Sequence, residues 1–279
     1  MKYILSAFAD EYSDSLTEQC SALNNFGIGY MEIRGVNGKN ISLLTPQEVK
    51  QVKQVLNDYG IKVSSVGSPV GKINLAGDLN AHLDMSKRVF ETANELGAGY
   101  VRGFSFYLPE GKTRRECRTQ VLFELERILN EANRSGIKYC HENEALIYGE
   151  GPDECKDLLD YFGGRLRCVF DMGNFVLDGY DPMAAYNKLA KYIEYFHIKD
   201  SLYAGAIVPA GKGEARIKDI LSEHKKTASD TFISLEPHLQ TFSGLNQLAA
   251  KSFDNPYKFP DQKTAFTSAV EHLKTLLQF

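Results

Sequence analysis

Four glycines that precede short apolar runs recur along the first half of the chain at nearly constant intervals. The pairs are Gly27-Ile28, Gly60-Ile61, Gly97-Ala98 and Gly136-Ile137, which lie 33 to 39 residues apart. Glycine is common just after the last turn of a helix, because it adopts the left-handed backbone conformation there at little cost. An interval of this length accommodates one strand and one helix. The sequence therefore predicts a chain built of repeated strand-helix units.

Eight short β-like runs can be counted, with helix-like segments between them. The runs end near Ala9, Arg34, Val66, Phe104, Glu142, Asp171, Ile198 and Glu236. Eight such units predict an α/β protein with a single (β/α)8 TIM barrel, in which residues 1–279 form one domain. A doubly wound open sheet is the alternative. Its one Gly-rich turn, Gly211-Lys212-Gly213, could bind a phosphate, but such a turn usually has no ligand.

Capping residues mark where several helices begin. Thr45 and Thr113 are each followed three residues later by glutamate, which predicts two capping boxes. Ser15 and Glu18 have the same spacing and predict a third. The last helix carries its apolar residues on one face, namely Phe266, Ala269, Val270, Leu273, Leu276 and Leu277.

Composition argues against several classes of protein. No apolar run approaches the roughly 18 residues that a membrane span needs, so no membrane partner is expected. The net charge of −4 argues against nucleic-acid binding, which usually requires a basic surface. Five cysteines without a CxxC pair are typical of reduced thiols in a cytoplasmic protein. Met1–Ala9 has some features of a signal peptide, but acidic residues follow at once and the segment is needed as the first strand.

The ends of four consecutive predicted strands carry side chains that bind metals. The fifth to eighth strands finish at Glu142, Asp171, His197 and Glu236. In a TIM barrel these strand ends meet at one mouth, the C-terminal end of the barrel. Three carboxylates and one imidazole can hold one divalent metal ion and leave positions open for substrate oxygens, which suits Mn²⁺, Mg²⁺, Co²⁺ or Zn²⁺. The plain alternative is that each acidic residue only caps the helix that follows it.

These strand ends resemble those of the sugar phosphate isomerase/epimerase family, whose members have the xylose isomerase-like TIM barrel. The motifs are HENE (141–144), DMGNF (171–175) and FHIKD (196–200), in this order and spacing. The similarity covers nearly the whole chain, from residues 8–11 (FADE) to residues 234–238 (SLEPH).

The resemblance implies one metal ion held by Glu142, Asp171, His197 and Glu236, and a small-molecule sugar or sugar phosphate as substrate. In similar ketose epimerases the two glutamates also move protons. Glu142 and Glu236 are therefore expected to act as acid and base, with proton transfer next to a metal-bound carbonyl through an enediolate. The implied activity is that of an isomerase or epimerase.

Further polar residues near the strand ends are candidates for substrate binding. The candidates are Lys199, Arg102, Arg34 and Glu144. The basic residues are expected to bind hydroxyls or a phosphate, and Lys199 is the best placed of them; ion pairing within the mouth is the alternative. Glu144 is expected to contact substrate or to support the site, with an exposed position at the surface as the alternative. The same expectations hold for Glu32 and His238.

The other histidines are expected to be structural. His141 directly precedes a ligand on its strand, so its side chain should face the opposite side. The remaining three fall in helix-like segments, where packing or solvated roles are usual: His82, His224 and His272.

Other reactions on the same barrel must be weighed. DNA repair enzymes of the endonuclease IV type share the strand-end residues but hold three zinc ions with additional histidines. One of those histidines is expected where this chain has Asn174, and six histidines in all are too few. Some ketose epimerases also have a histidine there, which puts their substrate in doubt here. Dehydratases of inositol-derived ketones, hydroxypyruvate isomerases and a non-catalytic carbohydrate-binding barrel are the remaining alternatives.

A long segment at about 237–261 follows the eighth strand and is rich in polar and aromatic residues. Loops of this length are uncommon as plain connections. It is expected to cover the site or to pack on another subunit of a homo-oligomer.

Overall fold

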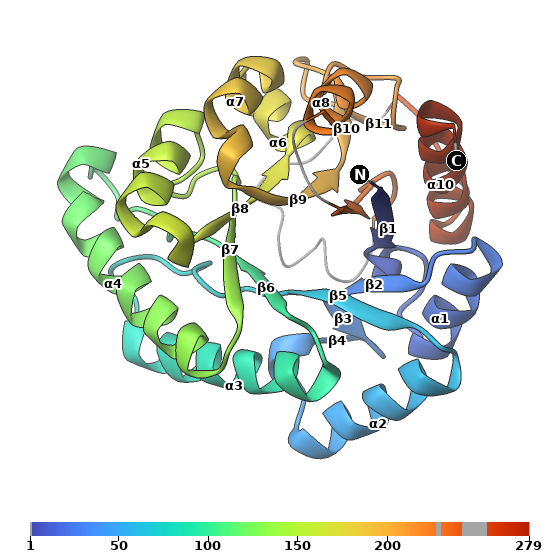
Figure 1. Cartoon of the computed structure of the whole chain (residues 1–279), viewed down its shortest axis with the longest axis horizontal. Coiled ribbons are helices and arrows are strands. Elements are labelled where there is room, and N and C mark those ends of the chain that lie inside the picture. The colour runs from blue at the N-terminus through green and yellow to red at the C-terminus, as the bar shows by residue number, and fades with distance from the viewer. Residues whose placement is uncertain (1, 227–229, 242–255, 279) are drawn as a thin grey trace.

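The computed structural model describes residues 2–226, 230–241 and 256–278. At its centre is a closed ring of eight parallel strands surrounded by helices (Figure 1). The first strand closes the ring, because Tyr3 pairs with Thr231 on one side and Ser6 pairs with Tyr30 on the other. The predicted TIM barrel is therefore confirmed, and the open sheet was wrong. In ring order the strands are β1 (Tyr3–Ala7), β12 (Thr231–Leu235), β9 (Ile193–Ile198), β8 (Arg167–Asp171), β7 (Lys138–Glu142), β6 (Tyr100–Gly103), β5 (Lys62–Gly67) and β2 (Tyr30–Ile33).

The helices lie outside the barrel and follow the strands in chain order (Figure 1). They are α1 (Leu16–Asn25), α2 (Pro46–Asp58), α3 (Leu79–Leu96), α4 (Arg114–Arg134), α5 (Pro152–Phe162), α6 (Met172–Leu177), α7 (Pro182–Leu189), α8 (Ile217–His224) and α10 (Gln262–Leu277). Two short hairpins complete the loops, β3 (Gly35–Val36) with β4 (Lys39–Asn40) and β10 (Asp200–Ser201) with β11 (Ile207–Val208). The sequence patterns do not predict these hairpins, since strands of two residues have no measurable periodicity.

The recurring glycines end helices as the sequence predicts. Gly97 follows α3 with a φ of 74°, and the amide of Ala98 donates a hydrogen bond of 2.9 Å to the carbonyl of Ala93. This is the bond that reaches back over five residues in a Schellman C-cap. The other three glycines have φ between 66° and 68°, and the amide after each makes the same bond. The interval between them therefore does report the length of one strand-helix unit.

Two of the three predicted capping boxes are confirmed. Thr45 and Thr113 each accept from the backbone amide three residues later, and the glutamate there accepts from the threonine amide. The box at Ser15 was wrong, because the Ser15 side chain makes no capping hydrogen bond. Glu18 pairs instead with Lys263 of α10 at 2.8 Å, so a contact between the first and last helices takes the carboxylate away from the helix end.

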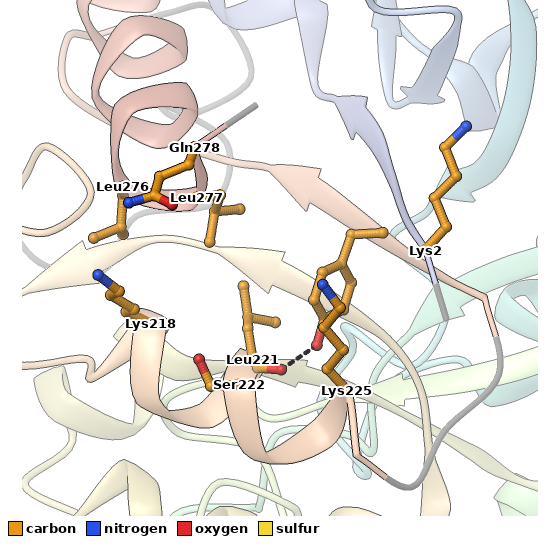
Figure 2. Close-up of a pocket in the computed structure, with 9 residues that line it drawn as sticks. Lys2, Lys218, Leu221, Ser222, Lys225, Leu276, Leu277 and Gln278 are labelled. Atoms are coloured by element: carbon orange, nitrogen blue, oxygen red, sulfur yellow. Dashed lines mark hydrogen bonds between the residues drawn. The ribbon is translucent and has the colours of Figure 1, made fainter.

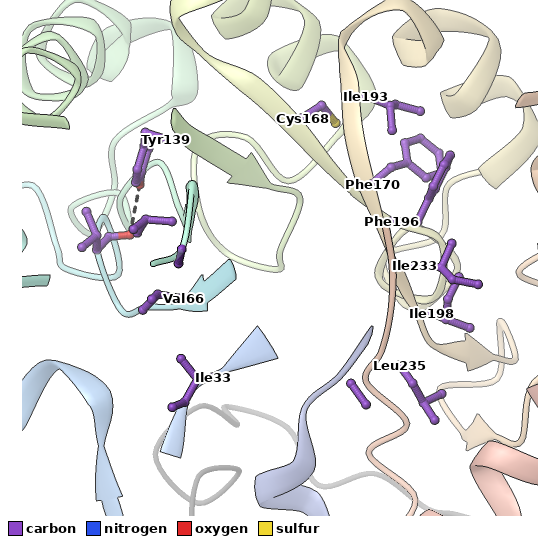
Figure 3. Close-up of a cluster of buried hydrophobic side chains, with 14 of the residues drawn as sticks. Ile33, Val66, Tyr139, Cys168, Phe170, Ile193, Phe196, Ile198, Ile233 and Leu235 are labelled. Atoms are coloured by element: carbon purple, nitrogen blue, oxygen red, sulfur yellow. Dashed lines mark hydrogen bonds between the residues drawn. The ribbon is translucent and has the colours of Figure 1, made fainter. Parts of the chain in front are cut away.

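Residues that alternate along the strands face either the helices or the barrel axis. The helix-facing residues are apolar, and Figure 3 shows Phe170, Phe196 and Ile233 among them. Phe170 packs on Tyr186 of α7, and Phe196 packs on His224 of α8. The residues that follow on the axis side at the C-terminal end are charged, and they form the candidate site. Strand alternation thus separates the hydrophobic core from the site.

One buried histidine in a helix supports a loop at the mouth of the barrel. His82 of α3 accepts a hydrogen bond of 2.8 Å at Nε2 from the amide of Gly71, which follows β5. Burial lowers the pKa of His82 to about 4. Between pH 6.5 and 4 the unfolded chain therefore binds a proton that the folded chain does not. The free energy of unfolding should fall as the pH falls through this window.

We expect His82→Gln to make this fall shallower by about 1–3 kcal/mol between pH 7 and pH 4.5. Glutamine keeps an acceptor for the Gly71 amide but does not titrate. Urea unfolding at the two pH values measures the effect. The control is His272→Gln, which makes the same substitution in a different helix, α10, and leaves His82 unchanged. If the free energy of unfolding fell with pH equally in His82→Gln and in the unchanged protein, His82 would not be the source of this pH dependence.

The sequence predicts reduced cysteines and no segment that spans a membrane, and the structure bears on both. All five cysteines are free and buried. No described helix is long and apolar enough to cross a membrane.

The predicted loop at about 237–261 lies largely outside the described residues, since 242–255 are not described. Its described ends are held together, because Gln240 Nε2 donates to the carbonyl of Phe259 at 2.9 Å and Gln262 Nε2 donates to that of Thr241 at 3.0 Å. Its expected role as a cover or subunit contact stays a prediction, as does the single domain over residues 1–279.

Candidate metal centre

Four side chains at the ends of neighbouring strands converge at the mouth of the barrel. Glu142 ends β7, Asp171 ends β8, His197 lies in β9 and Glu236 follows β12. One ligand atom from each lies within 4.8 Å of the others. All four residues are buried, with at most 3% of their surface exposed. The structure therefore brings together the four residues that the sequence selects as metal ligands.

His197 lies between carboxylates on both sides of its ring. Its Nδ1 is 2.8 Å from Glu142 Oε1 and 3.4 Å from Glu236 Oε2, while its Nε2 is 3.1 Å from Glu32 Oε2. Burial lowers the pKa of His197, but Glu142 and Glu32 oppose this and raise it well above its usual range. Nδ1 is the nitrogen that faces the candidate ligands Glu142 and Glu236, so it is the one placed to bind a metal ion.

The position of Glu32 at the end of a predicted strand does not decide whether it contacts substrate or supports the site. In the structure Glu32 lies against His197. It is buried in β2, and its other oxygen accepts a hydrogen bond of 2.9 Å from Tyr195 Oη. The tyrosine hydroxyl in turn lies 2.9 Å from Ser65 Oγ. A carboxylate that accepts from the second nitrogen of a metal-binding histidine fixes its tautomer and orientation. Glu32 is therefore a supporting residue of the site.

We expect Glu32→Gln to weaken binding of a divalent metal about 10- to 100-fold, because Gln accepts from Nε2 less strongly than a carboxylate does. Tyr195→Phe, which removes only the partner of Glu32, should have a smaller effect. Isothermal titration calorimetry with Mn²⁺ at pH 7.5 measures both. If Glu32→Gln bound Mn²⁺ as tightly as the unchanged protein, the support role of Glu32 would be wrong.

The three basic residues predicted to bind substrate all lie at this site, where each is paired with a candidate ligand. Arg102 Nε is 3.0 Å from Glu142 Oε2, and Arg34 Nη1 is 2.7 Å from Glu236 Oε1. Lys199 Nζ lies 3.0 Å from Asp171 Oδ2 and 3.1 Å from Glu236 Oε2. These ion pairs orient the carboxylates, so the predicted substrate contacts also act as positioning groups.

The neighbours of Arg34 were not identified from the sequence. Arg34 pairs with both carboxylate oxygens of Asp10, at 2.9 and 3.0 Å, and with Glu11 at 3.3 Å. Both acidic residues directly follow the predicted end of the first strand, near Ala9, so a search of strand ends could have found them too. Glu11 also accepts from the amide of His238 at 2.7 Å, and burial raises the pKa of Glu11 to about 8. His238 therefore lies beside Glu236 but supports the network of Arg34.

Carboxylates outnumber basic side chains in the buried part of the mouth. Among the described residues, arginine and lysine contribute three buried cations there, whereas seven buried carboxylates are present: Asp10, Glu11, Glu32, Glu142, Asp171, Asp200 and Glu236. Burial raises the pKa of Asp171 to about 7, against the opposing effect of Lys199. A divalent cation would offset this excess of negative charge, and three carboxylates with one imidazole are donors that Mg²⁺, Mn²⁺, Co²⁺ and Zn²⁺ accept. The donor set therefore fits a divalent metal ion.

Asn174, where a histidine occurs in some similar proteins, belongs to the frame of the site. Its amide donates to Asp171 Oδ1 at 2.8 Å, and its side-chain Nδ2 donates to the carbonyl of Asn143 at 2.9 Å. Asn143 also bonds to both the amide and the carbonyl of Asp171, at 3.0 Å each. Lys199 Nζ donates to Asn174 Oδ1 at 3.1 Å. Asp171 Oδ1 caps α6, as expected for an acidic residue at a helix start. Its second oxygen, Oδ2, faces Lys199 and takes no part in the cap.

Of two further residues discussed from the sequence, Glu144 lies at the mouth and His141 does not belong to the site. Glu144 lies at the mouth, where its Oε2 is 3.0 Å from Nζ of Lys72, a residue that the strand-end rule misses. His141 is buried and does not belong to the group of candidate ligands; its Nε2 lies 2.9 Å from Ser105 Oγ, in agreement with its predicted structural role.

The turn Gly211-Lys212-Gly213 is occupied by a carboxylate of the chain. The amides of Gly211, Gly213 and Ala215 donate to the Asp200 side chain at 2.8 to 3.0 Å. The phosphate-binding alternative for this turn was therefore wrong.

A separate cavity of about 360 Å³ lies at the opposite end of the barrel, beside the start of β1 (Figure 2). Lys218, Leu221 and Lys225 of α8 line it, together with Tyr3 and Leu276. The Tyr3 hydroxyl donates to the carbonyl of Leu221 across this cavity. Active sites of TIM barrels lie at the C-terminal end of the strands, so this cavity is not the candidate site.

The family of the chain follows from its sequence. Residues 20–274 match the model of the xylose isomerase-like TIM barrel family, so the chain belongs to that family. The resemblance drawn from the strand-end motifs is thereby confirmed. No functionally curated protein matches the chain.

Several solved structures share the fold. D-psicose 3-epimerase from Clostridium cellulolyticum H10, solved with D-tagatose, has 13% identity and a TM-score of 0.75, with 98% of each chain covered. A probable 3-DHS dehydratase from Bacillus anthracis has 17% identity and a TM-score of 0.73, with 98% of this chain and 99% of that chain covered. A xylose isomerase-like TIM barrel protein from Mycobacterium smegmatis, solved in complex with magnesium, has 15% identity and a TM-score of 0.72, covering 99% and 97%. At these identities the similarity shows a common fold.

Proposed function

We propose that the protein is a metal-dependent sugar isomerase or epimerase. The observation that carries this proposal is the convergence of Glu142, Asp171, His197 and Glu236 at the mouth of the barrel. The epimerase with bound tagatose and the barrel with bound magnesium, both of the same fold, support it. The proposal includes a divalent ion held by these four residues, with Glu142 and Glu236 as the acid and base.

The two glutamates are placed to move a proton at a carbon next to a carbonyl. A divalent cation, when bound, would polarise that carbonyl and make the neighbouring C–H more acidic. Glu142 and Glu236 come from β7 and β12, which β8 and β9 separate, so their carboxylates reach the centre from different directions. One glutamate takes the proton to form an enediolate. The other returns a proton to the opposite face, which gives epimerisation, or to the neighbouring carbon, which gives isomerisation.

Lys199 supplies a fixed positive charge beside this reaction. Burial lowers the pKa of its ammonium, but Asp171 and Glu236 oppose this and raise it above its usual range. The ammonium therefore stays protonated, and its three N–H groups donate to Asp171, Asn174 and Glu236. Its charge acts on the enediolate, on which negative charge develops, from a fixed position. Arg102 and Arg34 hold Glu142 and Glu236 in place.

Proton exchange with solvent tests the proposal directly. The protein, loaded with Mn²⁺, is incubated in D₂O with a panel of ketoses and ketose phosphates, and deuterium at the carbon next to the carbonyl is followed by NMR. We expect at least one compound to exchange more than about 100-fold faster than with protein treated with a chelator. Loss of a hydroxyl as water in the product would identify a dehydratase instead, the reaction named for the Bacillus anthracis neighbour.

Two results would overturn the proposal. One is that the purified protein binds no divalent metal ion, and the other is that exchange is equally fast without metal. Cytoplasmic location and a homo-oligomeric state stay predictions from the sequence.

A further inference from the structure

In the described part of the mouth, three basic side chains contact candidate metal ligands and a fourth pairs with Glu144, so that each of the four is paired with a carboxylate. Arg34, Arg102 and Lys199 contact the candidate ligands at 2.7 to 3.1 Å. The fourth is Lys72, in the loop after β5, which pairs with Glu144 at 3.0 Å. A phosphate group needs basic side chains whose charge is available to it. Here it would have to compete with a carboxylate for every one of them.

The formal charges of the described buried residues at the mouth leave no surplus for an anion. Seven buried carboxylates, Asp200 included, face three buried arginine and lysine side chains. With a divalent cation bound and His197 neutral as its ligand, the formal charges of these groups do not add up to a net positive value, even with Glu11 protonated. The pair of Lys72 and Glu144 adds one charge of each sign and changes nothing. A phosphate ester, which carries between one and two negative charges at neutral pH, would enter against this balance.

Two groups of backbone amides at the mouth also bind carboxylates of the chain itself. The amides of Gly211 and Gly213 donate to Asp200. The first turn of α6 donates through the amide of Asn174 to Asp171. Backbone amides of this kind are the usual alternative to basic side chains for binding a phosphate. In the described part of the mouth both of these groups are already used.

Lys72 and Glu144 are suited to a hydroxyl group. Glu144 is 28% exposed in its side chain, whereas that of Lys72 is only 7% exposed and lies over the Phe104 ring, 4.4 Å from its centre. Glu144 follows Glu142, the last residue of β7, by two residues, which places it at the same mouth as the metal centre. An ammonium beside a carboxylate offers a donor and an acceptor together. A hydroxyl both donates and accepts, whereas a phosphate oxygen without a proton only accepts.

We propose that the site takes an uncharged polyhydroxy ketone or aldehyde, and that the pair of Lys72 and Glu144 selects it against phosphorylated and carboxylated compounds. This inference rests on the proposed function and narrows its substrate class. Glu144 is the specificity-determining residue, because it pairs with Lys72, a mouth lysine whose ion pair is with none of the four candidate metal ligands.

Binding to the Mn²⁺-loaded protein tests the inference. A free ketose and its terminal phosphate ester are compared by isothermal titration calorimetry and by deuterium exchange, using the ketose that exchanges fastest in the panel. We expect the free ketose to bind at least about 10-fold more tightly than its ester, a difference of about 1.4 kcal/mol. Stronger binding or faster exchange of the ester would overturn the inference and leave the proposed function intact. Exchange with neither compound, together with no uptake of Mn²⁺, would overturn the proposed function itself and with it this inference.

The variant Glu144→Gln makes the test specific to the pair. It releases Lys72, so we expect the ratio of ester to free-ketose affinity to rise at least about 10-fold, and Lys72→Met added to it should remove that rise. The matched control is Glu95→Gln, which breaks the pair of Lys53 and Glu95 at the same 3.0 Å distance on the outer helices α2 and α3. Thermal unfolding and the Mn²⁺ affinity check that both variants remain folded. An unchanged ratio in folded Glu144→Gln would show that Glu144 does not set the specificity.

Discussion

Replacing Glu142 or Glu236 by glutamine is expected to lower metal-dependent proton exchange by at least about 1,000-fold. Each change removes one of three candidate carboxylate ligands and one of the two groups proposed to move the proton. Loss of a proton-transfer group alone typically costs 100- to 10,000-fold. Mn²⁺ affinity should fall as well, by about 100-fold or more, because a neutral amide is a poorer ligand than a carboxylate for a hard cation. Calorimetry and deuterium exchange measure the two effects separately.

The two variants differ in what they do to the fold. Glu142→Gln leaves the buried guanidinium of Arg102 without its carboxylate, although Arg102 Nη1 still donates to the carbonyl of Ser68 at 2.8 Å. Breaking one partner of a buried ion pair costs about 3–5 kcal/mol. Glu236→Gln keeps Arg34 paired with Asp10, so it should be the milder change. Circular dichroism separates loss of folding from loss of function, and Glu95→Gln serves as the surface control. Folded variants that retain Mn²⁺ binding and exchange would show that the centre lies elsewhere.

The barrel and the four converging residues could be predicted from the sequence because both depend on short-range patterns. Glycines after helices set the length of the repeated unit, and alternation along a strand decides which side chains face the axis. Once the strands close into a ring, the last axis-facing residue of each strand must lie at the mouth. Glu142, Asp171, His197 and Glu236 are found by this rule without any knowledge of their partners.

The partners themselves could not be predicted in this way, because they depend on depth in the barrel and on loop geometry. Glu32 reaches His197 across the barrel, from a strand that is not a neighbour of β9. Lys72 reaches Glu144 from a loop. The Asp200 carboxylate accepts hydrogen bonds from the amides of a glycine-rich turn whose sequence resembles a phosphate site. The Ser15 box failed for a similar reason, since Glu18 has a partner 245 residues away in Lys263. Long-range ion pairs thus decide details that local patterns leave open.

Gly71→Ala is expected to destabilise the protein by about 3–5 kcal/mol, because neither its conformation nor its surroundings accept a side chain. Gly71 has a φ of 81°, and a Cβ there would lie 2.1 Å from the carbonyl oxygen of Phe104. The neighbouring backbone cannot yield easily, since the amide of Phe106 donates to the Gly71 carbonyl and that of Phe104 donates to Val70, each at 2.8 Å. For a chain of this size the loss corresponds to a fall of roughly 10 °C in Tm.

Two other glycines separate the causes of this loss. Gly111 also has a left-handed conformation, with a φ of 74°, but nothing lies within 4 Å of the Cβ position, so Gly111→Ala should cost only about 1 kcal/mol. Gly99 has neither constraint, and Gly99→Ala should be nearly neutral. Because Gly71 precedes Lys72, the Gly71→Ala loop should also release Lys72 from Glu144 and weaken binding of a free ketose. A Gly71→Ala protein no less stable than Gly111→Ala would mean that the loop yields to the added methyl group and does not hold Lys72 in place.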